Sequence, residues 1–320
     1  MIESVRNRTM TPDDTSIFTD QQILDILDEE MNMQVLDKLQ KLHGENLTIS
    51  VDIPRNDKGE YEIPYRALGN KLRDISIVNG SVLYELAQIG LGELPDYTYG
   101  EDSNSYLDKF YIENNKIHLI QSSRGYTSVR MRYYLRPNVL TKKEQSGTIS
   151  SISIDNDADT ITLLLSTVGK LFSDSVQYDL IGNRSPNKIK AFDITPISLA
   201  ITGTVNQQNR TATMVLSLSE IQAQKNEIKV GDYVAIAEQT PVPNMPTEMH
   251  PLLAQAAAVQ LLEALTDTEA LKNAENRLMK MTVAVQDLID DRVELAPKKI
   301  KPRHSTLASS IGSRRGKGRY

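Results

Sequence analysis

The spacing of apolar residues changes its period several times along the chain. Between residues 20 and 43 apolar side chains recur at every third or fourth position, which places them on one face of a helix: Ile23, Leu24, Leu27, Met31, Val35, Leu39 and Leu42. Asp20 stands where an N-cap is expected, and Gly44 stands where the helix should end. A second helix is predicted over residues 81–92, and residues 1–15 are expected to be disordered.

From residue 47 the period changes to two, which is typical of half-buried strands. Residues 110–120 predict a hairpin that turns at Asn114-Asn115. In residues 128–137 the apolar positions alternate with the basic residues Arg130, Arg132 and Arg136. The basic face of this strand is a possible interface for phosphate or an acidic partner, or a solvated face of the sheet.

Residues 147–238 contain the highest density of strand and turn signals. They predict an antiparallel β-domain inserted over residues 141–245, folded as a small sandwich or a barrel. Pro241, Pro243 and Pro246 follow as a stiff linker. The almost wholly apolar run after Pro251 predicts a buried helix, and Thr266 with Glu269 predicts a capping box that starts the last helix.

These elements predict an α+β fold. Its core is a four-helix bundle with short β-hairpins, built from residues 16–140 and 246–296 and interrupted by the β-domain. Residues 297–320 are too polar to fold alone, and we expect them to form an extended tail.

Charge is distributed unevenly between the tail and the body. The tail carries eight Lys and Arg residues and no acidic residue, whereas the remaining sequence has 28 basic against 42 acidic residues. The tail could bind nucleic acid by counterion release or lie along an acidic protein groove. An acidic body with a basic arm is more typical of an assembly component than of a small-molecule enzyme.

The sequence contains no motif that predicts catalysis. There is no Cys, and the four His are too scattered for a metal cluster, so we expect no cofactor. Asp155, Asp157 and Asp159 resemble the start of a calcium loop but fit a hairpin turn better. His118 and His250 are interpreted as structural. The N-terminus has no apolar core, and no apolar run approaches the roughly 20 residues of a membrane span.

The order of several segments resembles the neck adaptor (head-to-tail connector) proteins of tailed bacteriophages. The similar stretches are IPYRALGNKLRDI, FYIENNKIHLI and RMRYYLRPNVL, followed by an inserted β-segment and by HPLLAQAAAVQLLEAL. The resemblance as a whole, with the segments between these stretches, extends over about two thirds of the chain. The turn here is Asn-Asn where the family often has Asp/Glu-Gly, and the larger β-insert looks more like the ring proteins of crAss-like podoviruses.

The resemblance implies a structural protein without enzymatic activity, placed in the neck of the virion and assembled in the host cytoplasm. Such proteins form a ring, commonly of twelve copies, that docks under the portal protein, seals the DNA channel and recruits further neck and tail proteins. Contact with passing DNA would be passive, and no membrane is involved. The tail residues implied to contact the portal are Lys298, Lys299, Lys301, Arg303, Leu307, Ile311, Arg314, Arg315, Lys317, Arg319 and Tyr320.

Two other functions are considered. A nucleic-acid-binding module would use the β-insert and the tail, but residues 147–238 are rich in Ser, Thr, Ile and Leu rather than in interleaved basic and aromatic residues. A hydrolase would use Asp155 or Asp193, for which the sequence supplies no paired acid or base.

Overall fold

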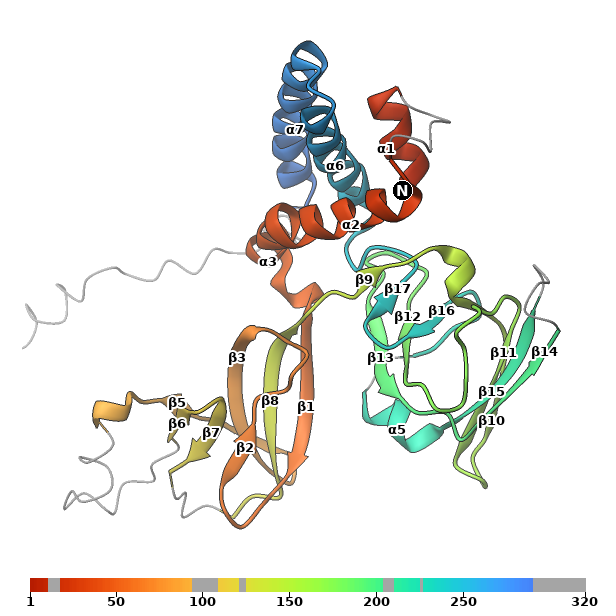
Figure 1. Cartoon of the computed structure of the whole chain (residues 1–320). Helices are drawn as coiled ribbons and strands as arrows, with labels where there is room; N and C mark the ends of the chain where they lie inside the picture. The colour runs from red at the N-terminus through yellow and green to blue at the C-terminus, as the bar shows by residue number, and fades with distance from the viewer. Residues whose placement is uncertain (11–17, 94–108, 121–124, 204–209, 225–226, 290–320) are drawn as a thin grey trace, which may run out of the picture.

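The computed structural model describes residues 1–10, 18–93, 109–120, 125–203, 210–224 and 227–289, and the fold is mixed α+β (Figure 1). Buried apolar residues gather in three main clusters. We call the corresponding parts of the chain the helical module, the β framework and the insert. The tail over residues 297–320 lies outside the described residues.

The helical module is built from both ends of the described chain. Its elements are α1 (Ile2–Thr9), α2 (Asp20–Glu30), a π-helical segment (Met31–Val35), α3 (Leu36–His43), α6 (His250–Ala264) and α7 (Thr268–Ile289). The apolar face expected for residues 20–43 is buried from Ile23 to Leu39. As expected, α6 is buried almost all round, with α7 folded back against it (Figure 1).

Two four-stranded sheets form the β framework. The first has the order β1 (Thr48–Pro54), β8 (Ser128–Leu135), β3 (Ala67–Asn79) and β4 (Val82–Glu85). The second has the order β2 (Glu60–Glu62), β7 (Lys116–Leu119), β6 (Lys109–Glu113) and β5 (Ala87–Gln88). The predicted hairpin and the alternating strand are both confirmed, with positive φ at Asn114 and Asn115 and with every second residue of β8 buried.

The insert is one seven-stranded antiparallel sheet. Its order is β13 (Ile189–Ile194), β12 (Tyr178–Ile181), β16 (Tyr233–Ile236), β10 (Gly147–Asp155), β11 (Thr160–Leu165), β15 (Thr211–Ser217) and β14 (Ser198–Thr202). Strand β10 pairs with β16 through Gly147 and Thr148 and with β11 from Ile149 onward, across a register shift. The two halves of the sheet share one apolar core with the short helix α5 (Leu218–Ala223). No described sheet closes into a barrel, so the barrel alternative is wrong.

The chain enters and leaves the insert through one pair of short strands. Strand β9 (Val139–Leu140) lies parallel to β17 (Gln239–Thr240), immediately before the proline linker. Entry and exit therefore lie side by side between the insert and the helical module (Figure 1).

Two predictions about helices are wrong. Residues 81–92 do not form a helix, because the chain turns at Asn79-Gly80 and pairs Val82–Glu85 with β3. The backbone hydrogen bonds that these residues form with β3 outweigh the weak helical spacing of their apolar side chains. The four-helix bundle therefore lacks this member, and α1 packs on α6 instead.

The N-terminus is the second correction, because residues 1–10 are not disordered. Val5 of α1 is fully buried in the core of the helical module, and Arg8 donates to Gln255 of α6 at 2.6 Å. Residues 11–15 lie outside the described residues. An eight-residue helix is marginal alone, so α1 depends on this packing.

The helix caps also differ from those expected. Thr19 rather than Asp20 caps α2, in a reciprocal capping box with Gln22. Asp20 instead accepts from Arg6 at 2.9 Å and from Lys142 at 3.1 Å. At the start of α7 Asp267 accepts from the backbone N–H of Ala270, while Thr266 adopts φ +58° and ends the preceding turn.

The packing of α1 can be tested by truncating its buried side chain. We expect Val5→Ala to lower the free energy of unfolding by about 1–3 kcal/mol, because it leaves a cavity against α6. Met10→Ala is the matched control and should change it by less than about 0.5 kcal/mol, since Met10 is 90% exposed. Urea denaturation measures both. Equal stability of Val5→Ala and the parent protein would contradict the burial of α1.

Candidate functional site

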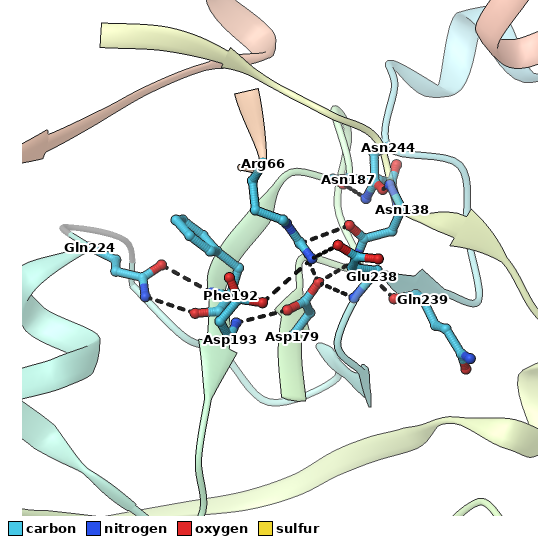
Figure 2. A network of polar contacts seen from close by, with 10 residues as sticks. All are labelled: Arg66, Asn138, Asp179, Asn187, Phe192, Asp193, Gln224, Glu238, Gln239 and Asn244. Carbon is cyan, nitrogen blue, oxygen red and sulfur yellow. Dashed lines mark hydrogen bonds and ion pairs between the residues drawn. The ribbon is translucent and has the colours of Figure 1, made fainter. Parts of the chain in front are cut away.

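The most heavily buried basic residue among the described residues is Arg66, in the connection between β2 and β3. The backbone N–H of Ala67 donates to Pro64 across a turn, and the carbonyl of Arg66 accepts from the N–H of Arg136. These two contacts fix the backbone on both sides of the side chain. The guanidinium is 2% exposed and extends from the β framework into the insert (Figure 2).

Arg66 contacts residues from three other parts of the chain. Its Nη2 donates to Asp179 Oδ2 of β12 at 2.6 Å and to Asn138 Oδ1 beside β9 at 3.0 Å. Its Nη1 lies 3.5 Å from Asp193 and 3.8 Å from Glu238. We call Arg66, Asn138, Asp179, Asp193 and Glu238 the Arg66 junction.

Asp179 is the anionic centre of the junction and is completely buried. All four residues of β12 are buried, so one face of this strand packs in the core of the insert and the other faces the junction. The carboxylate accepts four hydrogen bonds, from Arg66, from the Asn138 amide at 2.6 Å, and from the backbone N–H groups of Asp193 and Glu238. Asp193 and Glu238 both adopt positive φ, which aims these N–H groups at Asp179.

Two opposing effects act on the charged groups of the junction: burial disfavours their ionised forms, and the neighbouring partners stabilise them. Burial raises the pKa of Asp179 above its ordinary value, and the Arg66 guanidinium and the other donors oppose that rise. Burial and a hydrogen bond with Asp193 raise the pKa of Tyr65, next to Arg66, to about 12. Arg66, Asn138 and Asp179 are buried, whereas Glu238 lies at the exposed rim of the junction, so the buried centre acts as a fixed ionic clamp.

A chain of amides extends the junction toward the helical module. Asn138 also donates to the carbonyl of Gln239, and its own N–H donates to Asn244 Oδ1 at 3.0 Å. Asn244 donates in turn to the carbonyl of Asn187 in the insert. Both chain connections to the insert are therefore held to it by side-chain amides (Figure 2).

A second polar contact ties the helical module to the same connection. The Asp28 carboxylate of α2 accepts from the Leu140 N–H of β9 at 2.8 Å and 3.0 Å. Burial raises the pKa of Asp28 to about 6, with a smaller contribution from Asp25, and the Leu140 hydrogen bond opposes the rise.

The basic residues predicted on β8 are not gathered into one site. Arg130 forms a two-pronged ion pair with Asp52 of β1 at 2.6 and 2.7 Å, and Arg132 lies 3.2 Å from Asp74 of β3. Arg136 follows the end of β8 and is exposed beside a small cavity between the β framework and the insert. The eleven predicted portal-binding residues of the tail all lie outside the described residues.

The other sequence candidates have structural contacts, Asp155 in an exposed turn and the two histidines in more buried positions. Asp155 accepts from the N–H groups of Asp157 and Ala158 in the β10–β11 hairpin turn, as expected. His118 stacks on Tyr111, with ring centroids 4.8 Å apart. His250 is largely buried at the start of α6, and burial lowers its pKa.

Among the described residues, no group of three or more His, Asp or Glu side chains could hold a metal ion. None of the described helices combines the length and apolarity needed to cross a membrane.

Sequence reasoning missed the junction. Arg66 was part of a recognised stretch, but nothing marked it as buried, and Asp179 has no motif around it. The one available signal was a single acidic residue within the short apolar run Tyr178–Ile181, which predicts a buried and paired carboxylate. The comparison with known proteins adds no identification, since no family model and no curated protein matches this chain.

The Arg66 junction can be tested against a matched ion pair. Arg66→Ala should lower the free energy of unfolding by about 3–5 kcal/mol, because it leaves the Asp179 carboxylate buried without its cation. Arg130→Ala, which breaks an equally short but partly exposed pair, should cost about 1 kcal/mol or less. Adding Asp179→Asn to Arg66→Ala should recover part of the loss. Equal costs for the two single variants, measured by urea denaturation, would contradict the clamp.

The Asp28 contact predicts a pH dependence. The folded protein holds a proton on Asp28 up to about pH 6, whereas the unfolded chain releases it near its ordinary pKa of 3.8. The contribution of Asp28 to stability is therefore present below pH 3.8 and is lost as the pH rises to about 6.

Asp28→Asn cannot ionise and keeps one acceptor for Leu140. We expect its stability relative to the parent protein to increase across this pH range. Asp157→Asn, in an exposed turn, is the control and should show no such trend. The test is the urea denaturation midpoint of each protein at several pH values. If the difference in midpoint between Asp28→Asn and the parent does not change with pH, the raised pKa of Asp28 is wrong.

Proposed function

We propose that this protein is a structural head-to-tail connector, a neck ring protein of a tailed bacteriophage. It docks under the portal, seals the DNA channel and recruits the tail, and it has no enzymatic activity. The proposal rests on the resemblance of the ordered sequence segments to neck adaptors. The geometry of the Arg66 junction is the observation that supports it best.

The junction unites the segments that carry the resemblance. Arg66 belongs to the stretch over residues 61–75, and Asn138 belongs to the stretch over residues 129–140. Asn244 precedes α6, which is the apolar helix of the fourth stretch. Residues far apart in the sequence thus cooperate in holding three modules at fixed positions. A part that transmits contacts between rings requires such a fixed arrangement.

Charge supports the same role. The sequence before the tail has 28 basic and 42 acidic residues, so an acidic channel wall would not hold the phosphate backbone of passing DNA. The basic tail supplies the contact to the portal through its eight cations, with Leu307, Ile311 and Tyr320 as apolar anchors. Apolar anchoring is needed because ordering the tail costs about 1–2 kcal/mol per residue.

One feature favours the alternative, a nucleic-acid-binding module. Arg184, Lys188, Lys190 and Lys229 line a cavity of about 240 Å³ in the insert. Two of these cations are already paired, Lys190 with Asp232 at 2.7 Å and Lys229 with Glu227 at 2.9 Å. Because these pairs neutralise much of the charge, we favour the connector.

Docking through the tail can be tested with truncated protein. A variant that ends at Ala296 should remain folded but lose stable binding to purified portal. A full-length variant with Leu307→Ser and Ile311→Ser should bind more weakly, because the apolar anchors are removed while all charges remain. Portal binding by the truncated protein that equals the full chain would refute docking through the tail.

The ring and the alternative function need separate measurements. Electron microscopy of native particles should show cyclic symmetry for this protein, and a single copy per particle would refute the ring. Protein that ends at Ala296 should not bind duplex DNA at moderate salt. Tight DNA binding by that variant would favour the nucleic-acid module.

A further inference from the structure

Strand β1 is an edge of its sheet, and its outer row of backbone groups faces the insert. In the order β1-β8-β3-β4 it pairs with β8 alone. The N–H of Leu135 donates to the carbonyl of Leu47, and the N–H of Arg55 donates to the carbonyl of Thr127. With the register of this pair, odd-numbered residues of β1 bond to β8 and even-numbered residues point their N–H and C=O away. Ser50 is the central residue of the outward row.

A cleft lies along this edge. It has a volume of about 510 Å³, and one wall is the consecutive run Ile49–Asp52 of β1. The opposite wall comes from the insert, through Phe192 of β13 and through Glu220 and Gln224 at α5. Pro64 and Tyr133 complete an apolar lining. Four consecutive residues of one strand can all line a cleft only when it runs along the strand's backbone edge.

On the opposite side of the cleft, the backbone of the insert at Phe192 is already hydrogen-bonded by a side chain. Strand β13 is also the last strand of its sheet, but the side-chain amide of Gln224 accepts from the Phe192 N–H at 3.0 Å and donates to the Phe192 carbonyl at 3.1 Å. Gln224 thus imitates a neighbouring strand at this point. The cleft is asymmetric: no described strand pairs with the outer edge of β1, whereas the edge of β13 is bonded by Gln224 at Phe192.

The charged residues that line the cleft indicate which kind of ligand it would bind. The lining contains two acidic residues, Asp52 and Glu220, and no basic residue. Asp52 is held by Arg130. Glu220 lies in the first turn of helix α5, and partial burial raises the pKa of its carboxyl. A cation placed beside Glu220 would stabilise its ionised form.

We propose that this cleft binds an extended segment of a partner protein, which adds to β1 as a further strand, places a large apolar side chain against Tyr133 and Phe192, and sets a Lys or Arg beside Glu220. Strand addition supplies affinity through main-chain hydrogen bonds, and the apolar and acidic lining supplies selectivity. The inference is independent of the connector role, since it rests only on the edge, the cleft and its charges.

The test uses full-length protein and a synthetic probe. The probe is a fluorescein-labelled peptide, Lys-Thr-Val-Thr-Phe-Thr-Val-Arg, and binding is followed by fluorescence anisotropy. Ser50→Pro removes the outward N–H and leaves the ladder with β8 intact, because proline is tolerated at such edge positions. It should weaken binding about ten-fold or more, whereas Ser50→Ala, which keeps the N–H, should bind as the parent does. Equal affinity of the parent and Ser50→Pro would overturn the proposal.

A second measurement covers the case in which Ser50→Pro disturbs folding. The probe should slow hydrogen–deuterium exchange in residues 48–53 of the parent protein, and unchanged exchange there would overturn the proposal. Glu220→Gln should weaken binding and reduce its dependence on salt. A probe with Glu at both ends, or with Ser in place of Val and Phe, should bind poorly, and binding as tight as the original would overturn the proposed selectivity.

The chain's own tail is the competing occupant. If full-length protein ignores the probe while protein ending at Ala296 binds it, the tail rather than a partner fills the cleft, and the proposed partner is wrong. Equal binding by both forms supports a partner segment.

Discussion

The buried ion pair between Arg66 and Asp179 constrains the rest of the structure. Removing two charges from water is costly, and the cost is offset only when each charge meets well-placed partners. Here the partners come from the β framework, the insert and the connection between them. The pair can form only when these parts adopt one relative position. Because a buried pair of this kind adds little to net stability, we infer that it serves to specify one arrangement of the modules.

The contacts around the pair extend this constraint to the helical module. Strands β9 and β17 bring the entry and exit of the insert together, and Asn138 and Asn244 attach both connections to it. Asp28 then fixes α2 to β9. The contacts form a continuous series from α2 to the core of the insert. The connector role that we propose requires such a continuous series of contacts.

The arrangement also creates the surface from which we infer a partner. The junction holds the insert beside β1, and the space between them becomes a cleft along a strand edge that no described strand extends. Unpaired edges favour aggregation unless they are covered, and the nearby insert shields this one from indiscriminate pairing. The same geometry admits a single extended chain of suitable sequence. Rigidity at the junction and selectivity at the edge therefore have one structural origin.

The sequence by itself determined the elements whose signals are local. The apolar face from Ile23 to Leu39 and the alternation along β8 follow from the period of the side chains, and the hairpin follows from its Asn114-Asn115 turn. The turn signals between residues 147 and 238 likewise predicted antiparallel strands, which the structure shows. The tertiary structure alone decided that residues 82–85 form a strand, since pairing with β3 supplies hydrogen bonds that helical spacing cannot anticipate.

The tertiary structure also decided that α1 is ordered, because its stability comes from α6, more than 240 residues away in the sequence. The candidate site belongs wholly to this second class. Arg66 and Asp179 are 113 residues apart; the apolar run around Asp179 indicates a buried carboxylate, but nothing in the sequence identifies Arg66 as its partner. A charged residue reveals its role only when folding removes it from water and brings its partner within hydrogen-bonding distance.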